Sequence, residues 1–312
     1  MSAPPSPWSS VTLYGVEHSP WVQGIRLALA HHRIPTQLTS VPPGLSWLWR
    51  QGPVFPVLQL ADGTTHVDSF EMYARLEDAG HSLGMERLSP QERCRAQVEL
   101  EQLFTVYALG RCGSGKAWRF IEAWSTMREV PFRWQGVLCR AILSLYFWIL
   151  IQLGIRMTKR AKRTPYDLDV IERRLARWDQ RLEGERWLTG AELGFLDFAL
   201  WGHIQCMTCG LTDELLPIVA RQRNLMAWLD RIMETQTDYT PMYARRSVDR
   251  SAAVARSGPR ERWLFWLAWL GWIMALPLTL VLLCVGFRGR FKNPARSGAV
   301  LARSRRAARP RA

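Results

Sequence analysis

Cysteines and acidic residues are scarce in this sequence. Six of its 312 residues are cysteines, scattered along the chain without the density of a disulfide scaffold, so we expect free thiols in a reducing compartment. Asp and Glu number 27 against 41 Lys and Arg, which leaves a net charge of +14. Nine of the basic residues lie in the last 25 residues, where there is no acid, so residues 1–287 carry only +5. This uneven distribution argues against a nucleic-acid partner.

The N-terminus lacks the features of a secretory signal peptide. Residues 1–10 have no basic start, no apolar run and no cleavage pattern, and their Ser and Pro content indicates a disordered segment. We therefore expect the head of the protein, which is the part before residue 243, to face the cytoplasm.

Charge is also absent from the 25 residues between Trp263 and Phe287. A helix of about 20 apolar residues can cross a membrane, and tryptophans crowd the first half of this segment, as is typical of a headgroup boundary. We predict a C-terminal membrane anchor over 263–287, either a single-pass transmembrane helix or a re-entrant helix broken at Pro277. Both alternatives stay open because the linker 243–262 and the tail 288–312 are basic, and basic flanks favour the cytoplasmic side. Membrane lipid is thus an expected partner of the anchor and of the tail, which is predicted to be disordered.

Residues 11–79 alternate between short strands and helices. Runs rich in β-branched residues predict four strands, with a hairpin turn at Asp62-Gly63 between the last two. Helices are expected from Ser19-Pro20 and from Ser69. The expected strands are Val11 to Tyr14, Thr36 to Val41, Val57 to Leu60 and Thr64 to Val67. A short helical turn is expected at Gly44 to Arg50.

From Ser89 onward the pattern predicts helices alone. Ser89 and Glu92 have the spacing of a capping box, and Thr164 to Asp167 repeats it before a helix with one apolar stripe. The apolar run Ala141 to Ile155 is short for a membrane span, so we interpret it as a core helix of the head, with contact to lipid as the alternative. The apolar stripe of the helix that follows Asp167 consists of Leu168, Ile171, Leu175, Trp178 and Leu182.

Four local motifs carry a resemblance to a known family. They are Val11-Thr-Leu-Tyr-Gly followed by Ser19-Pro-Trp-Val-Gln-Gly, Val54-Phe-Pro-Val-Leu, Asp62-Gly ahead of Asp68-Ser, and Gly194-Phe-Leu-Asp. Spread in this order over residues 11 to about 235, they resemble the glutathione transferase superfamily. Gly194 departs from the family pattern, which has Ser or Thr there, and Asp68 stands where Glu is commoner.

The resemblance implies both a fold and an activity. The fold class is an α/β thioredoxin-like glutathione-binding domain over residues 11–82, followed by an all-α helical domain over 88–242 and then by the linker, the anchor and the tail. The activity is that of a glutathione transferase with glutathione as co-substrate. In it Ser19 is the catalytic hydroxyl, and four residues bind glutathione: Phe55, Pro56, Asp68 and Ser69.

The chemistry of conjugation explains why a hydroxyl is needed at this place. A free thiol has a pKa of about 8.5, so a donor must stabilise the glutathione thiolate. The Ser19 hydroxyl, beside the positive end of a helix, would do so. Two alternatives stay open: Ser19 is simply a helix cap, or Tyr14 is the donor, although Tyr14 fits better as a core or wall residue. Residues Tyr107, Trp118 and Trp124 are expected to form an apolar wall for the acceptor.

The sequence therefore predicts a membrane-tethered glutathione S-transferase that conjugates glutathione to a small, lipophilic electrophile, as in detoxification. The alternative is a non-catalytic, metaxin-like adaptor at a membrane surface, and a homodimer is an open possibility. No metal is expected, because His203, Cys206 and Cys209 drift around a helix and lack a second ligand pair. Residues 110–116 resemble a phosphate-binding loop, but Ala117 replaces the hydroxyl residue that holds magnesium.

Overall fold

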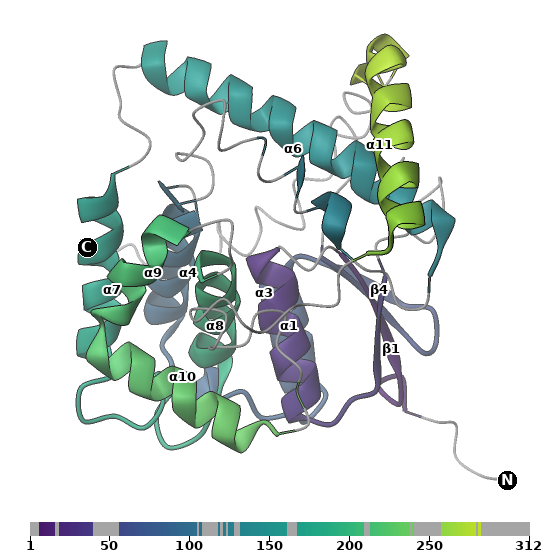
Figure 1. Ribbon diagram of the computed structural model, residues 1–312. Coiled ribbons are helices and arrows are strands. Elements are labelled where there is room, and N and C mark those ends of the chain that lie inside the picture. Colours follow the sequence, from purple (N-terminus) through teal and green to yellow (C-terminus); the bar gives the residue numbers. More distant parts are fainter. Residues whose placement is uncertain are drawn as a thin grey trace, which may run out of the picture.

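The chain folds into an α/β unit followed by helices, as the sequence predicts (Figure 1). This computed structural model describes residues 6–15, 19–39, 56–104, 106–107, 118, 121–122, 124–127, 132–160, 167–208, 213–237, 239, 257–278 and 280–281, with side chains in helix α6 given for residues 134–146, 148 and 149. The helical turn expected at residues 44–50 lies outside these ranges. Free cysteines among the described residues are Cys94, Cys139 and Cys206, as expected.

A four-stranded mixed sheet forms the N-terminal unit, in the order β2-β1-β3-β4. Strand β1 runs parallel to β2 and antiparallel to β3, and β4 is antiparallel to β3. The first and third strands match the predicted bounds, and β4 begins one residue later than expected. Strand β2 begins at the predicted residue, and residues 40 and 41 of its predicted range lie outside the described ranges. The strands are β1 (Val11–Tyr14), β2 (Thr36–Thr39), β3 (Val57–Leu60) and β4 (Thr65–Val67).

Two helices of the N-terminal unit lie between the sheet and the helical domain (Figure 1). They are α1 (Pro20–His31) and α3 (Ser69–Asp78). One hydrophobic core runs from the sheet through these helices into the helical domain, so the two domains share it. The helical domain contains α4 (Pro90–Phe104), α6 (Trp134–Arg160), α7 (Leu168–Arg181), α8 (Phe195–Met207), α9 (Leu216–Ala220), α10 (Arg223–Thr235) and α11 (Pro259–Met274), with short 3-10 turns at Met85–Arg87 and Asp213–Leu215.

The predicted helix starts are confirmed at α4 and corrected at α7. The Ser89 amide donates to Glu92 Oε2 at 2.8 Å, and the Glu92 amide donates to Ser89 Oγ at 3.2 Å, which completes the capping box. Helix α7 is capped by Asp167, whose Oδ1 accepts from two backbone amides, and not by Thr164, which lies outside the described residues. The stripe of α7 is buried except for its first member, Leu168, which is exposed because the cap places it at the helix end.

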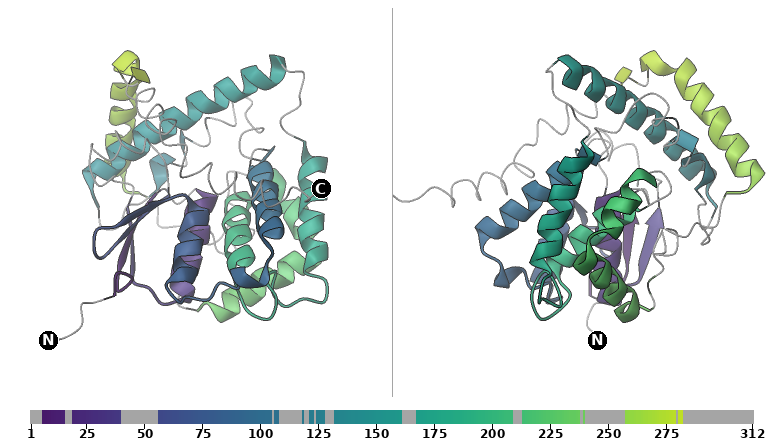
Figure 2. Two further views of the ribbon diagram at one scale, coloured as in Figure 1. Left: turned by 180° about the vertical axis from the view of Figure 1, so that it is seen from behind. Right: turned by 60° about the vertical axis from the view of Figure 1, so that its left-hand side comes forward.

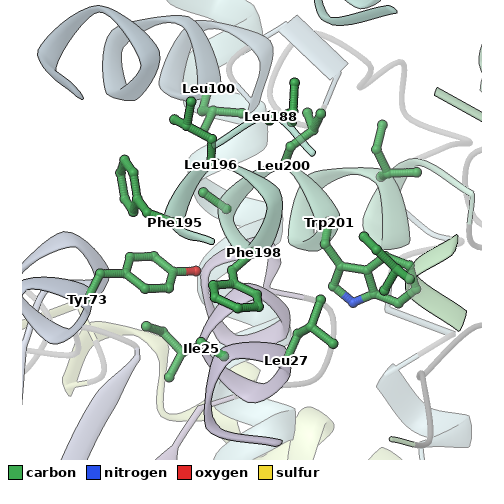
Figure 3. Close-up of a cluster of buried hydrophobic side chains, with 14 of the residues drawn as sticks. Ile25, Leu27, Tyr73, Leu100, Leu188, Phe195, Leu196, Phe198, Leu200 and Trp201 are labelled. Atoms are coloured by element: carbon green, nitrogen blue, oxygen red, sulfur yellow. The ribbon is translucent and has the colours of Figure 1, made fainter. Parts of the chain in front are cut away.

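Helices α1 and α8 touch through two glycines. A Cβ atom on Gly202 would overlap the Pro20 carbonyl oxygen and lie 2.8 Å from the Gly24 nitrogen. A Cβ on Gly24 would lie 2.7 Å from the Phe198 carbonyl oxygen and 2.5 Å from the Tyr73 hydroxyl. Figure 3 shows Tyr73 and Phe198 packed around this contact with core residues of α1. Because backbone faces backbone here, no side chain can be added without moving a helix.

Substitution of Gly202 by Ala should therefore destabilise the head. We expect a loss of about 1–3 kcal/mol or more in the free energy of unfolding, because the added methyl group forces α8 away from α1. Denaturant unfolding followed by circular dichroism measures it. Gly271→Ala is the matched control, since a Cβ there meets nothing within 4 Å, and equal losses in the two variants would contradict the steric argument.

The start of α8 is built around the buried carboxylate of Asp197. Its oxygens accept from the Gly194 amide at 3.1 Å, the Leu188 amide at 2.9 Å and the Trp228 indole at 2.8 Å. Burial raises the pKa of Asp197, and these donors lower it. The Thr189 hydroxyl donates to Asp197 as well, at 3.1 Å.

Thr189 also explains why Gly194 departs from the family pattern. Its Oγ1 accepts from the Leu196 amide at 3.1 Å, so it supplies the hydroxyl that Gly194 lacks. A side chain on Gly194 would collide with the Leu83 carbonyl oxygen and come within 2.9 Å of Thr189 Cβ. The cap is therefore complete, with its hydroxyl contributed by Thr189, five residues upstream of the N-cap position Gly194.

Replacement of Thr189 by Val should remove this cap while it keeps the side-chain volume. We expect a loss of about 1–3 kcal/mol in the free energy of unfolding, because the Leu196 amide and one Asp197 oxygen lose a buried partner. Thr189→Ser keeps the hydroxyl and should retain most of the stability in the same unfolding experiment. An unchanged stability of Thr189→Val would show that the hydroxyl does not matter, and a loss from Ser as large as that from Val would show that the methyl group contributes as much as the hydroxyl.

Helices α6 and α11 form a separate layer that packs outside the main core (Figure 2). Phe265 of α11 is fully buried in a cluster with Val137 and Ala141 of α6. The Trp272 indole donates to the Leu138 carbonyl at 3.3 Å, and the Ser257 amide donates to the Thr126 carbonyl at 2.8 Å. The run 141–155 is thus part of a longer helix, and Ala141 and Leu143 of this run belong to the cluster of this layer and not to the main core.

The predicted membrane-spanning anchor is not supported. The helix that covers its first half, α11, ends at Met274 and is followed by a turn at Ala275, after which residues 276–278, 280 and 281 are again helical. No helix in the described part of the chain is both long and apolar enough to cross a membrane. Residues 282–287 of the predicted anchor lie outside the described ranges.

Candidate functional site

The sheet topology brings the predicted site residues to one edge. Val57, at the start of β3, is opposite Tyr14 at the end of β1 and opposite Val67 at the end of β4. These three side chains form a small buried cluster. Ser19 follows β1, Pro56 precedes β3 and Asp68 follows β4, so the ends of three strands place them at the same edge.

Ser19 lies at the start of α1 but does not cap it with its side chain. Its backbone is extended, with φ −86° and ψ 122°, and its carbonyl accepts from the Gln23 amide at 3.0 Å. The hydroxyl makes no capping hydrogen bond, and the side chain is partly buried. Ser19 is therefore the N-cap residue through its backbone alone, so a cap through its hydroxyl is contradicted, and the hydroxyl lies beside the free amides of the first turn.

Asp68 and Ser69 begin helix α3. Asp68 has a positive φ of 89°, which is unusual for a residue with a side chain, and its Oδ1 accepts from the Phe70 amide at 2.9 Å. Ser69 is the first helical residue and is buried. The cap is therefore Asp68 and not Ser69. A strained backbone of this kind is typical of functional positions.

Pro56 is buried directly before β3, at the edge where the glutathione backbone is expected to bind. Phe55, whose backbone was expected to pair with the ligand, lies outside the described residues.

Tyr14 is engaged with the sheet. Its hydroxyl donates to Gln59 Oε1 at 2.7 Å, across the β1–β3 pair. Burial raises the pKa of Tyr14, while the nearby Arg133 lowers it. Because this hydroxyl already donates to a neighbouring strand, Tyr14 is the weaker candidate for a thiolate donor, and its burial fits the core or wall residue that the sequence favoured.

The three aromatic residues expected to form the acceptor wall do not lie together. Tyr107 is buried in the main core, where its hydroxyl lies 3.3 Å from His203 Nδ1. Trp124 belongs to the α6–α11 layer, and Trp118 stacks on Trp266 of α11 with ring centroids 5.3 Å apart. The predicted wall is therefore wrong, because residues 107 and 118 belong to different clusters.

A different aromatic group lies beside the site. Trp21, two residues after Ser19, contacts Phe70 at 5.7 Å and Phe104 of α4 at 6.2 Å between ring centroids. These partly buried rings pack against the main core. Trp21 directly follows Ser19-Pro20, and Phe70 directly follows Asp68-Ser69. This proximity to predicted site residues is a signal in the sequence that we missed. Phe104 could not be placed without the contact between the domains.

The buried ring of His203 packs against this aromatic group. Its ring meets Trp21 edge to face at 4.7 Å, and it is fully buried. Burial lowers the pKa of His203 to about 3, so the ring is neutral at physiological pH. Cys206 is buried on the same helix, and within the described ranges no group of His, Cys, Asp or Glu residues could hold a metal ion.

Replacement by alanine should change the free energy of unfolding differently at the starts of α1 and α3. Ser19→Ala should leave the free energy of unfolding within about 0.5 kcal/mol of wild type, because no cap is lost. Asp68→Ala should lower it by about 1 kcal/mol or more, because it removes a cap and leaves alanine at a positive φ. Thermal or denaturant unfolding without ligand measures both, and a Ser19→Ala loss as large as that of Asp68→Ala would restore the capping role of Ser19.

Comparisons with known proteins point to one family for the N-terminal unit. Residues 13–81 match the family model described as glutathione S-transferase, N-terminal domain. A comparison with curated proteins gives no match. Residues 13–81 contain the described strands β2, β3 and β4, the second half of β1, and helices α1 and α3.

Solved structures give a more distant similarity. A glutathione S-transferase from Methylobacillus flagellatus, with glutathione bound, is 18% identical with a TM-score of 0.44, and the match covers 74% of this chain and 100% of that one. One from Methylobacterium radiotolerans, in complex with glutathione sulfonate, is 20% identical with a TM-score of 0.41, over 80% and 97%. Rice GST1 in complex with glutathione is 16% identical with a TM-score of 0.42, over 77% and 96%. Because these TM-scores lie below 0.5, no conclusion about this chain rests on them. The resemblance to the glutathione S-transferase N-terminal domain rests on the sequence match of residues 13–81.

Proposed function

We propose that this protein is a glutathione S-transferase that binds glutathione where β1, β3 and β4 meet and adds its thiolate to a small electrophile. The match of residues 13–81 and the convergence of Ser19, Pro56 and Asp68 at one sheet edge support this proposal. The observation that carries it is the Ser19 hydroxyl, which stands at the start of α1 without a capping bond.

The Ser19 hydroxyl would stabilise the bound thiolate. The thiol of glutathione must lose its proton before the sulfur can attack, and the product forms when the new sulfur–carbon bond is made. Lowering the thiol pKa by about 2 units requires about 2.7 kcal/mol of preferential stabilisation of the anion. A hydrogen bond to a charged sulfur contributes about 1.5–3 kcal/mol, and a helix N-terminus adds about 0.3–1 kcal/mol.

The rest of glutathione would be bound along the same edge. The backbone of Phe55, before Pro56, would pair with the cysteinyl part, and Asp68 and Ser69 would hold the γ-glutamyl end. The Asp68 carboxylate suits the α-amino group of that end, since opposite charges attract at short range. Arg133, close enough to influence Tyr14, is a candidate partner for a glutathione carboxylate.

The acceptor would lie against the rings of Trp21, Phe70 and Phe104. These aromatic side chains flank the start of α1 and offer apolar surface next to the expected position of the sulfur. An apolar, flat electrophile fits this surface better than a charged one.

A non-catalytic adaptor is the second candidate function. The Gly194 departure that favoured it is offset by Thr189, which completes the α8 cap. The α6–α11 layer still favours it, because it adds an exposed apolar surface outside the head. Glutathione binding and turnover separate the two candidates, since an adaptor would show neither.

Titration of bound glutathione tests the enzyme proposal. Thiolate absorbance should reveal a pKa about 2 units below the free value in the wild-type complex, and Ser19→Ala should return most of that difference, with a fall in kcat of about tenfold or more. Ser19→Thr keeps a hydroxyl and should keep part of the shift.

Tyr14→Phe is the matched control because it removes the rival hydroxyl without altering Ser19. It should leave the thiol pKa unchanged. The proposal fails if glutathione titrates in the wild-type complex as it does free in solution, or if Tyr14→Phe abolishes the shift and Ser19→Ala does not.

A further inference from the structure

One face of α11 exposes an apolar row. Trp263 is 69% exposed, Leu267 62%, Leu270 56% and Met274 78%. Their spacing of four, three and four residues places them on one side of the helix. We call these four residues the α11 row. Exposed apolar side chains in a continuous row of this kind mark a surface that binds something.

The chain continues the row beyond the end of the helix. Leu278 is 62% exposed and Val281 58%, again at spacings of four and three. The opposite side of α11 is occupied, since Phe265 is fully buried against α6 and the Trp272 indole donates to the Leu138 carbonyl. The α11 row is therefore held outward by a packed rear face, at the outside of the molecule (Figure 2).

Charge around the α11 row favours an anionic partner. Arg260 and Arg262 are exposed at the start of α11. Arg262 lies 3.9 Å from the Glu122 carboxylate, whereas Arg260, three residues before Trp263, lies on the side of the row. In the sequence, residues 244–262 carry six Arg against two acids, and residues 288–312 carry nine basic residues and no acid. In the sequence, basic segments thus precede and follow the row.

This charge pattern argues against a second copy of the chain as the occupant. Two copies that met through the α11 row would bring their own basic flanks together, and like charges repel. An anionic bilayer offers the complementary arrangement, with apolar side chains below the headgroups, arginines at the phosphates and a tryptophan near the boundary.

We propose that the α11 row docks the protein on the surface of an anionic membrane, with α11 lying in the plane of the headgroups. This mode differs from a spanning anchor, because both basic flanks stay on the same side of the membrane. It is independent of glutathione binding, since the α11 row contains none of the residues at the sheet edge.

Flotation of the full-length protein with vesicles tests the proposal. Vesicles of phosphatidylcholine with phosphatidylserine should bind the wild type, and Leu267→Glu and Leu270→Glu together should weaken binding by about tenfold or more, since they place acid on the apolar face. Vesicles of phosphatidylcholine alone should bind more weakly, as should the anionic vesicles at high salt.

Leu168→Glu is the matched control, because Leu168 is an exposed leucine on α7, away from the α11 row. It should float as the wild type does, and all variants should keep glutathione binding. The proposal is overturned if Leu267→Glu/Leu270→Glu floats unchanged, or if the wild type does not float.

Two further measurements separate the other modes of association. Trypsin added outside the vesicles should cleave the basic tail, whereas a protected tail would mean that the helix spans the bilayer and the proposal is wrong. Light scattering without lipid should show the same mass for wild type and variant, whereas a dimer that Leu267→Glu/Leu270→Glu dissociates would reassign the α11 row to self-association.

Discussion

The position of the candidate site depends on the direct contact between α1 and α8. Gly24 and Gly202 allow the two backbones to meet, so α1 is held between the sheet and the helical domain with no adjustable side chain in between. Ser19 is the residue before α1, so its backbone is fixed relative to both domains. A donor intended for a thiolate must be fixed in this way, because reorganisation of a loose hydroxyl would consume the stabilisation that it gives.

The contact also explains the placement of the aromatic group at the site. Trp21 lies in the first turn of α1, and His203, the residue after Gly202, meets its ring edge to face. The close approach of the helices therefore puts a neutral, buried imidazole directly behind the ring that faces the site. The residues of the proposed acceptor surface and of the proposed thiolate donor are thus positioned by one packing constraint.

Much of the N-terminal unit could be predicted from sequence because its signals are local. The β-branched runs, the Asp62-Gly63 turn and the Ser19-Pro20 helix start each act within a few residues. The sheet edge at which the predicted site residues lie could be predicted from the order of the strands along the chain. The acceptor wall could not be predicted, because the partners of Trp21 come from α4 and α8, and such long-range contacts leave no periodic trace. The departure at Gly194 could not be explained from the sequence either, because its compensation by Thr189 depends on a loop that folds back. In α11, lack of charge suggested a span, but the pattern did not reveal that Phe265 packs on α6.

The shared use of Thr189 and Asp197 links a loop to a helix. The hydroxyl and the carboxylate join the backbone of residues 188 and 189 to the first turn of α8 through several buried hydrogen bonds. These amides should open to solvent as one cooperative unit, and not by fraying from the helix end. Since α8 also supports α1, the thermodynamic linkage runs in both directions: a ligand that holds the start of α1 would slow hydrogen exchange in a loop that it never touches.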